Sequence, residues 1–239
     1  ILRRLVGSEM CIRDSDYSQI ELRVLAHLSN DKSMIDMLQN RESDIHSETA
    51  SKIFQTNIES VTKDMRRKAK EVNFGLIYGM ESFGLSKSLN ISKKEAEELI
   101  EAYFSQFPKI KGFLDKIVDD ATTNTFTETL YGRKRYIKEL ASSNFQLKAM
   151  GKRIAMNAPI QGTASDIMKI AMIKLNKEIQ KIKSTDLLLQ IHDEIIIQTP
   201  KESANKVSKI VKKEMECASK LKVPLFVDIK ENINLSNLN

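Results

Sequence analysis

Residues 62–79, TKDMRRKAKEVNFGLIYG, constrain the fold of this chain more than any other stretch. Thr62 is a residue type that caps helix N-termini, and Asp64 follows in the first turn, where a negative charge is favoured. Gly79, at the other end, is typical of the residue that closes a helix. The pattern therefore predicts one helix across the whole stretch.

Four side chains recur every four residues in this helix: Arg66, Lys70, Phe74 and Tyr78. A step of four overshoots one helical turn by roughly 40°, so they form a slowly winding stripe about 18 Å long. Two cations begin the stripe and two aromatic rings end it. A nucleoside triphosphate has the same polarity, with anionic phosphates at one end and a flat base at the other. From this stretch alone, a basic amphipathic helix with an apolar end is an equally good interpretation.

The composition sets broad limits on the class of protein. At 239 residues, the chain is long enough for one large domain or two subdomains with a real core. Its net charge of +6 is compatible with a polyanionic partner. The two cysteines signal neither a disulfide framework nor a zinc cluster, which fits a reducing compartment. No apolar run approaches membrane-spanning length, so we expect a cytoplasmic protein with no membrane partner.

The stretch that opens at Asp16 is predicted as a turn followed by a helix. Ser18 and Glu21 have the spacing of a capping box, which puts Asp16 just before the helix N-terminus. Carboxylates are common there because of the helix dipole alone, and Glu21 could be only a capping partner. Residues 1–15 show neither the alternation of a strand nor the stripe of a helix.

Residues 44–125 are predicted to be mainly helical. Asp44 precedes a helix whose first turn holds His46, and a lone histidine there is more often structural than catalytic. Further helices are expected to begin at Ser92, which has a glutamate three residues later, and at Pro108.

A short hairpin is predicted over residues 126–137, with Gly132 at its turn. Its tip carries the basic residues Arg133, Lys134 and Arg135. A solvated charged turn is the usual form of such a cluster, although a basic tip can also hold a phosphate backbone.

Two helices are expected on either side of Pro159, over about residues 144–157 and 161–182. Three hydrogen-bonding side chains recur here at intervals of four: Arg153, Asn157 and Gln161. Such donors suit the acceptors of a nucleic-acid minor groove. An ordinary polar helix face is about as good an interpretation.

A second hairpin is predicted over residues 186–199, DLLLQIHDEIIIQT. His192, Asp193 and Glu194 stand between its two apolar runs, at or beside the turn. A purely structural turn would favour Asn-Gly or Asp-Gly, so we favour a functional role for the carboxylate pair. A last strand, residues 223–229, is expected beside this hairpin.

Asp16 and Asp193 are each expected at the end of a short element within a sheet. Converging carboxylates suit Mg²⁺, which prefers hard oxygen ligands and keeps substrate phosphates in its coordination shell. Two such ions about 4 Å apart stabilise the attacking and leaving oxygens of a phosphoryl displacement. The helix over residues 62–79 would add cations for the phosphates and a ring for the base.

Four motifs together resemble the family A DNA polymerases, the bacterial DNA polymerase I type. They are DYSQIELR at 16–23, RRKAKEVNFGLIYG at 66–79, RIAMNAPIQGTASD at 153–166 and IHDE at 191–194. The motifs stand in the family's order, and the resemblance runs from Asp16 to near the C-terminus.

The resemblance implies an α+β fold, a polymerase palm with a small antiparallel sheet plus a helical fingers subdomain, with the thumb absent from this chain. The palm would take residues 16–43 and 126–239, and the fingers residues 44–125. We expect residues 1–15 to be a non-native or unmatched lead-in, a foreign junction or a misassembled gene end, because CIRDS stands where the family has an apolar strand.

The resemblance also implies a DNA-templated DNA polymerase that transfers dNTPs to a primer 3′-hydroxyl with two Mg²⁺ ions. We expect a nucleoid-associated monomer that acts in DNA repair or replication. Asp16, Asp193 and the Tyr17 carbonyl would hold the ions, and Glu194 would support them. Lys70 would also give a proton to the departing pyrophosphate.

The remaining roles that the resemblance implies concern the two substrates. Arg66 and Lys70 would grip the triphosphate, and Phe74 would pack against the sugar and base. Tyr78 would stack near the nascent pair, and Glu21 would block a ribose 2′-hydroxyl. The dNTP-binding residues are thus Arg66, Lys70, Phe74, Tyr78, Glu21 and His46. The primer–template residues are Arg23, Arg153, Asn157, Gln161, His192, Arg133 and Arg135.

Two other classes of protein stay open. One is a folded fragment that binds nucleotide or primer–template without catalysis, which primer extension would separate from an enzyme. The other is a metal phosphohydrolase or nuclease that uses the Asp pair. That class needs a further ligand set, and the three histidines, at 27, 46 and 192, do not have the spacing of a ligand cluster.

Overall fold

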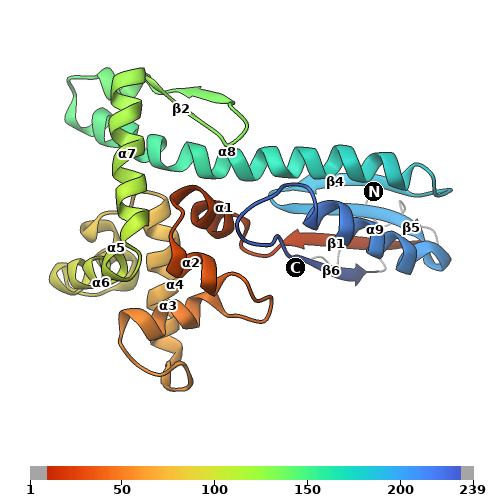
Figure 1. The fold of residues 1–239 in the computed structure, drawn as a ribbon, viewed down its shortest axis with the longest axis horizontal. Helices are drawn as coiled ribbons and strands as arrows, with labels where there is room; N and C mark the ends of the chain where they lie inside the picture. The colour runs from red at the N-terminus through yellow and green to blue at the C-terminus, as the bar shows by residue number, and fades with distance from the viewer. Residues whose placement is uncertain (1–9, 233–239) are drawn as a thin grey trace. The chain divides into compact units, whose positions relative to one another are not determined.

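The computed structural model describes residues 10–232 (Figure 1). The chain divides into two compact units, one from residues 1–20 and 164–239 and the other from residues 21–163. The first unit combines a sheet with helices, and the second is mostly helical. The α+β class predicted from the sequence is confirmed.

A four-stranded antiparallel sheet forms the centre of the first unit. Its strands are β1 (Met10–Tyr17), β4 (Asp186–Ile191), β5 (Glu194–Pro200) and β6 (Val227–Asn232), in the order β4-β5-β1-β6. Helix α9 (Ala204–Glu216) contacts β1, β5 and β6. Tyr17 anchors this packing, because its buried Oη donates to the Met215 carbonyl at 2.7 Å.

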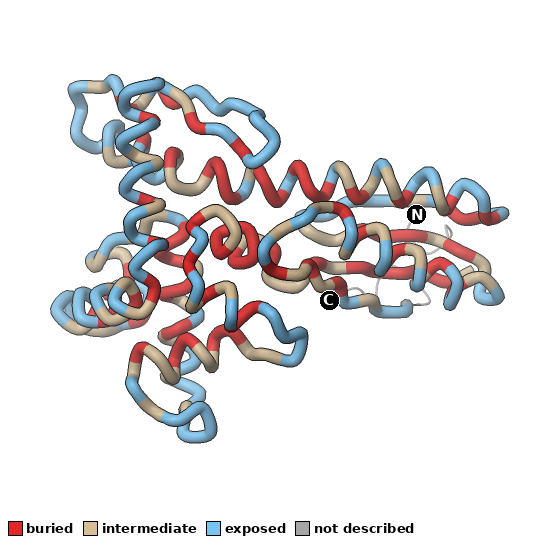
Figure 2. The backbone as a smooth tube through the Cα atoms, viewed as in Figure 1, coloured by how far each residue is buried: buried red, intermediate tan, exposed pale blue. Residues whose placement is uncertain are grey.

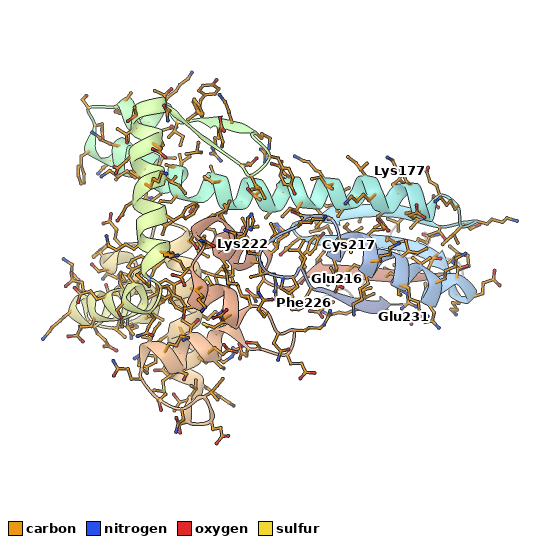
Figure 3. All side chains as sticks on the ribbon, in the orientation of Figure 1. Lys177, Glu216, Cys217, Lys222, Phe226 and Glu231 are labelled. Carbon is orange, nitrogen blue, oxygen red and sulfur yellow. The ribbon has the colours of Figure 1, made fainter. Side chains whose placement is uncertain are left out.

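Strand β1 is a correction to the sequence analysis, which found no strand pattern before Asp16. The strand begins at Met10 and is paired on both edges, with Cys11 and Ile12 buried. The strand pattern was not recognisable because two charged residues, Arg13 and Asp14, lie within it, and each is only 5% exposed. Arg13 is paired with Glu231 of β6 at 2.8 Å, and Figure 3 labels that glutamate. Residues 1–9 lie outside the described part, and the foreign origin of residues 1–15 stays a prediction.

The last strand also differs from the prediction. It begins at Val227 rather than at residue 223, and it pairs with β1 rather than with the β4–β5 hairpin. Both edges of β5 are already occupied, by β4 and by β1. The last strand bonds instead to the edge of β1 that β5 leaves free.

The second unit is built from short helices and one small hairpin. The helices are α1 (Ile20–Ser29), α2 (Lys32–Met37), α3 (Ile45–Ile53), α4 (Lys63–Ile77), α5 (Ser82–Leu89), α6 (Lys93–Gln106) and α7 (Pro108–Asn124). The hairpin consists of β2 (Phe126–Glu128) and β3 (Lys134–Tyr136). Single 3₁₀ turns lie at Ile58–Ser60, Lys138–Ala141 and, in the first unit, Lys201–Ser203. Figure 2 shows that buried residues lie along one side of most of these helices.

Helix α4 confirms the prediction for residues 62–79. Thr62 is the N-cap, and its Oγ1 accepts from the Met65 N–H at 3.2 Å. Gly79 follows the C-cap residue with φ of +68°, the left-handed conformation that favours glycine. A Cβ at this position would also come 2.9 Å from Cγ of Arg153, so both conformation and space favour glycine here.

Helix α8 (Phe145–Ile179) is another correction, because it continues through Pro159 instead of breaking there. An internal proline costs about 3 kcal/mol through its missing N–H and its steric clash. Ala155, Ala158 and Ile160 are all buried, and burial of one isoleucine alone stabilises by about 1.5–3 kcal/mol. Packing around the proline therefore holds the helix. The division between the two compact units falls within α8, after Thr163.

The compact units do not follow the predicted palm and fingers boundaries. Helices α1 and α2, predicted within palm residues 16–43, pack with residues 21–163, as does the hairpin that begins palm residues 126–239. The predicted boundaries divide the chain by function rather than by packing, and they stay a prediction. Within residues 10–232, no helix combines the length and the apolar character needed to cross a membrane.

Candidate active site

Carboxylates gather on one face of the sheet in the first unit. Asp16 stands opposite Glu194 of β5 on one side and opposite Asp228 of β6 on the other. Directly opposed residues share a face, and so does Asp14, two positions earlier in β1. Asp193 lies in the β4–β5 turn, where its carbonyl accepts from the Tyr17 N–H at 3.3 Å. The structure thus brings the three predicted carboxylates together and adds two.

The sequence analysis missed Asp14 and Asp228. Asp228 carried a usable signal, since it lies in an apolar run that alternates like a strand. Asp14 carried none, because a charged residue in a central strand is recognisable only once its neighbours are placed.

This crowding changes the acidity of the carboxylates. The pKa of Asp16 is raised to about 7, chiefly by burial and then by Asp193, Glu194, Asp14 and Asp228. Burial followed by neighbouring carboxylates also raises the pKa of Glu194. Oδ1 of Asp16 is buried without a hydrogen-bond partner among the described residues.

These features fit a divalent cation with hard oxygen ligands. A cation would neutralise the mutual repulsion and give the Asp16 oxygen a partner. No three His, Cys, Asp or Glu residues within the described part form a complete metal-binding group. Carboxylate oxygens suit Mg²⁺, which typically takes one or two carboxylates and completes its shell with water and substrate phosphates.

The turn that carries Asp193 is conformationally unusual. His192 has φ of +52°, and only two residues join the paired positions Ile191 and Glu194. A left-handed non-glycine residue costs of order 1–3 kcal/mol and is more frequent at functional sites. The exposed His192 and the half-buried Asp193 therefore sit on a tight, strained turn.

In the second unit, the stripe predicted on α4 exists and has a partner at its cationic end. Arg66 and Asp44 form a two-point ion pair, with Nε to Oδ2 at 2.6 Å and Nη2 to Oδ1 at 3.3 Å. Asp44 also caps α3 by accepting from the His46 N–H at 3.1 Å. Burial would raise the pKa of Asp44, but hydrogen bonds from Arg66 and Ser47 outweigh it and lower the value to about 2. The sequence analysis gave Asp44 no role beyond the helix start.

His46 is buried, with 3% of its surface exposed, which fits a structural histidine, and its expected contact with the dNTP stays a prediction. Its Nδ1 lies 3.2 Å from the amide nitrogen of Asn73, and its ring centroid lies 5.6 Å from that of Phe74. Its pKa is lowered to about 4, chiefly by burial, while Arg66 and Lys70 add to the effect and Asp44 opposes it. The histidine is neutral at pH 7.

Glu21 and Tyr78 meet at the aromatic end of the stripe, where the Tyr78 hydroxyl donates to Oε2 of Glu21 at 2.6 Å. Tyr78 is 36% exposed and Phe74 is half-buried, so both rings are partly accessible. Lys70 is exposed on the same helix.

Arg23, which is expected in duplex contact, is buried in this structure, and that contact stays a prediction. Only 3% of its surface is exposed, and Nη1 donates to the carbonyl of Leu38, the C-cap residue of α2, at 2.9 Å. An arginine that satisfies a helix-terminal carbonyl in the interior has a structural role.

The other duplex candidates within residues 21–163 lie on α8 and the basic hairpin. Arg153 and Gln161 are exposed, while Asn157 is half-buried and its Oδ1 has no hydrogen-bond partner within residues 10–232. Arg135 is exposed, and Nη2 of Arg133 donates to the Gly162 carbonyl at 2.9 Å. The last contact fastens the hairpin to α8.

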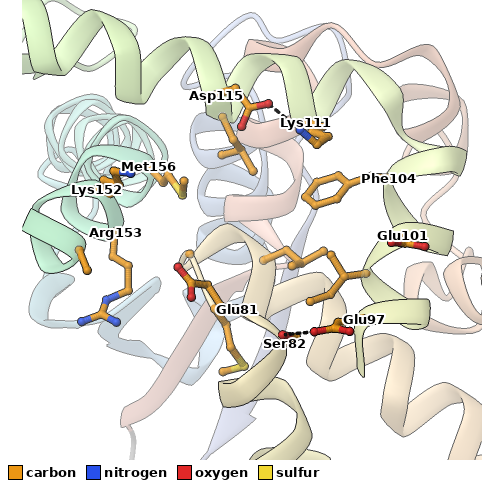
Figure 4. Close-up of a pocket in the computed structure, with 16 residues that line it drawn as sticks. Glu81, Ser82, Glu97, Glu101, Phe104, Lys111, Asp115, Lys152, Arg153 and Met156 are labelled. Carbon is orange, nitrogen blue, oxygen red and sulfur yellow. Dashed lines mark hydrogen bonds and ion pairs between the residues drawn. The ribbon is translucent and has the colours of Figure 1, made fainter. Parts of the chain in front are cut away.

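The second unit also contains a cavity of about 450 Å³ (Figure 4). Leu76, Phe104 and Met156 contribute apolar surface to it. Its charged lining residues are Glu81, Glu97, Glu101, Asp115, Lys111, Lys152 and Arg153. Lys111 is already paired with Asp115 at 2.8 Å. With four carboxylates against three cations, the cavity does not favour a phosphate group.

Comparison with known proteins identifies relatives. A family model described as DNA polymerase family A matches residues 3–236, and this match begins within the segment 1–15 for which none was expected. DNA polymerase I of Caldicellulosiruptor bescii is 51% identical over 225 residues, which are 92% of this chain and 26% of that protein. DNA polymerase I of Streptococcus pneumoniae strain R6 is 47% identical over 219 residues, 91% of this chain and 25% of that protein. The chain spans about a quarter of the length of these relatives.

A solved structure extends the likeness to the fold. It is described as the POL domain of Pol1 from M. smegmatis in complex with DNA primer-template and dNTP. The TM-score is 0.91 at 38% sequence identity, over 96% of this chain and 41% of that one.

Proposed function

Because the chain belongs to DNA polymerase family A, we propose that it catalyses the templated addition of deoxynucleotides to a primer 3′-hydroxyl. The observation that carries the proposal is the carboxylate face of the sheet. There, Asp16 is held against Asp193 and Glu194 with a pKa raised to about 7 by burial and by these neighbours. Such a cluster is unfavourable without a cation and suited to one.

Asp16 and Asp193, with the Tyr17 carbonyl, are the residues that would hold Mg²⁺, and Glu194 would support them. When bound, Mg²⁺ neutralises the charge that develops on the attacking and leaving oxygens of phosphoryl transfer. His192, exposed beside Asp193 on the strained turn, would lie at the primer terminus.

The α4 stripe would bind the incoming nucleotide. Arg66 and Lys70 would pair with the phosphates, and Arg66 would then exchange Asp44 for a phosphate oxygen. Lys70 would donate a proton to the departing pyrophosphate. Both cations would thus bind the phosphates, and Lys70 alone would also protonate the leaving group.

The aromatic end of the stripe would select the sugar. Phe74 would pack against sugar and base, and Tyr78 would stack near the nascent pair. Glu21, held by the Tyr78 hydroxyl, would occupy the space of a ribose 2′-hydroxyl. A carboxylate fixed by a hydrogen bond is a better steric gate than a mobile one.

Primer–template DNA would contact residues on α8 and the basic hairpin. Arg153, Asn157 and Gln161 would read minor-groove acceptors, and Arg133 and Arg135 would approach the phosphate backbone. We propose that the chain works as a cytoplasmic, nucleoid-associated monomer on DNA and dNTPs.

Single-nucleotide addition to a primed DNA template with Mg²⁺ tests the proposal. Asp193→Ala should lower the rate at least 10³-fold, which corresponds to about 4 kcal/mol. The circular dichroism spectrum should stay unchanged, because the residue lies in a turn. Asp186→Ala, at the exposed other end of β4, is the matched control and should keep full activity.

The outcomes separate the possible functions. Undiminished extension by Asp193→Ala would overturn the metal role. If neither the unaltered chain nor Asp193→Ala extends the primer, but the unaltered chain binds primer–template or dNTP measurably, the protein is better described as a non-catalytic binding protein. Release of inorganic phosphate or cleavage of DNA in place of extension would favour a phosphohydrolase or nuclease.

A further inference from the structure

Asn73 has no role in the proposed function, yet it is completely buried on α4. Its amide nitrogen donates to Oγ1 of Thr49 at 3.1 Å and lies 3.2 Å from Nδ1 of His46, both residues being on α3. The Thr49 hydroxyl lies 3.4 Å from the amide oxygen of Asn73. Asn73 therefore connects the two helices at their buried face.

The contact with His46 fixes the position of the imidazole proton. An amide nitrogen carries only donor hydrogens, so Nδ1 of His46 must accept. The neutral ring then carries its proton on Nε2. Nε2 is buried and has no hydrogen-bond partner among the described residues.

The surroundings of His46 keep the ring in the neutral form that this hydrogen bond requires. Burial is the main cause of its lowered pKa. The charged groups that act on it are Asp44, which caps its own helix, and Arg66 and Lys70 of α4. Asp44 favours the protonated form and Arg66 and Lys70 oppose it, while burial keeps the pKa of His46 at about 4.

The His46 ring in turn contacts Phe74, which is expected to pack against the nucleotide sugar. The ring planes of His46 and Phe74 are tilted by 51° with centroids 5.6 Å apart, within the range of favourable aromatic pairs. Asn73 and Phe74 are neighbours on α4. The His46 ring therefore bonds to Asn73 through Nδ1 and packs against the ring of Phe74.

We infer that Asn73 is a positioning residue: it holds His46 as the Nε2–H tautomer and thereby fixes the imidazole against Phe74. The sugar-selecting consequence rests on the proposed function. The tautomer itself does not, so the two can be tested apart.

Nitrogen-15 NMR of the histidine side chains tests the tautomer in the 239-residue chain without substrate. The chain has only three histidines, and the His46 signal is identified by its loss in His46→Gln. We expect the Nε2–H pattern at pH 7. An Nδ1–H pattern would overturn the inference, and this measurement needs no variant of Asn73.

Asn73→Asp tests the hydrogen bond directly, because a carboxylate accepts where the amide donated. It should reverse the tautomer or raise the pKa of His46 by more than one pH unit. Asn57→Asp is the matched control, since Asn57 is exposed and makes no side-chain capping bond. An unchanged tautomer and pKa in a folded Asn73→Asp chain would contradict the inference.

The functional consequence is measured as the ratio of dideoxynucleotide to deoxynucleotide incorporation efficiency. Asn73→Asp should change this ratio at least threefold, while Asn57→Asp should not. A merely structural role would lower the rate or the stability and leave the ratio unaltered, and that result would overturn the positioning role. If the unaltered chain does not extend primers, the proposed function fails, whereas the NMR result still decides the tautomer.

Discussion

The hydroxyl of Tyr78 donates to Oε2 of Glu21 at 2.6 Å, across 57 positions of sequence. The bond joins the C-cap residue of α4 to the first turn of α1. It leaves the Tyr78 ring partly accessible while it fixes the Glu21 carboxylate. The position of Glu21, expected to exclude a ribose 2′-hydroxyl, therefore depends on Tyr78, expected to stack near the nascent pair.

This dependence predicts that Tyr78→Phe weakens sugar selection without removing either the ring or the carboxylate. Ribonucleotide incorporation relative to deoxynucleotide should rise several-fold, because Glu21 loses the bond that fixes it. Glu21→Ala should raise the ratio further, since it also opens the space. Tyr131→Phe, the same change at another exposed tyrosine, serves as control, and equal ratios in all chains would contradict the gating role of Glu21.

The acidity of Asp16 predicts how stability depends on pH. The pKa is about 7 in the folded chain, chiefly through burial, and about 3.9 in an unfolded one, so the folded state binds more protons between these values. This contribution to stability is complete below about pH 4 and is lost as the pH rises through about 7. Urea unfolding in EDTA should therefore give a higher midpoint at pH 5 than at pH 8.

Mg²⁺ should reduce or reverse that difference, because it binds the ionised carboxylates. Asp16→Asn should flatten the pH dependence and remove most of the Mg²⁺ effect on the midpoint. A midpoint that stays pH-dependent and Mg²⁺-sensitive in Asp16→Asn would show that other groups are responsible.

Asp44 combines two stabilising contacts that substitution can separate. Asp44→Ala loses the cap of α3, worth about 0.5–2 kcal/mol, and the ion pair with Arg66. Both partners of that pair are more than 40% exposed, so it adds no more than about 1 kcal/mol. Asp44→Asn retains a capping side chain and should cost less, as measured by urea denaturation at pH 7.

The same pair predicts a pH signature. Although burial opposes it, hydrogen bonding to Arg66 and Ser47 lowers the folded-state pKa of Asp44 to about 2, below the unfolded value near 3.9. The stabilisation is present above about pH 4 and is lost as the pH falls through about 2. The difference between the unaltered chain and Asp44→Asn should therefore shrink at acid pH, and a constant difference would exclude the ion pair as its source.

Phe74→Tyr tests the sugar-sensing role of the stripe. A hydroxyl on this ring would replace the polar contact that a dideoxy sugar lacks, so dideoxynucleotides should be accepted more readily by tenfold or more. Primer extension with competing dideoxy- and deoxynucleotides measures the ratio. Phe104→Tyr is the control away from the stripe, and an unchanged ratio in Phe74→Tyr would exclude the role.

Sequence patterns predicted the elements whose local chemistry is self-sufficient. Helix α4 has an N-cap residue at one end and a glycine just past the other. The β4–β5 hairpin has two apolar runs with charged residues at the turn between them. The Asp16–Asp193 site followed from the turn expected before the helix near Ser18, from the hairpin and from the resemblance, and the structure brings both residues to the carboxylate cluster.

The sequence-based predictions were wrong where contacts with residues distant in the sequence determine the local structure. Arg13 and Asp14 made β1 unrecognisable, because their burial depends on β6. Pro159 argued for a helix end that packing overrides. The contact between Asn73 and His46 has no sequence signal, since it joins residues 27 positions apart.

The β4–β5 turn has a consequence for how this protein can vary. Ile191 and Glu194 are paired with two residues between them, and strands alternate their faces at every position. One inserted residue in the turn would have to shift β4 against β5 or bulge out of the hairpin, and either change would move Asp193 relative to Asp16. An irregularity between Leu187 and Leu189 tolerates a register change in β4, but it lies far from the carboxylates. The length of this loop is therefore fixed by the chemistry at its tip as much as by the packing of the strands.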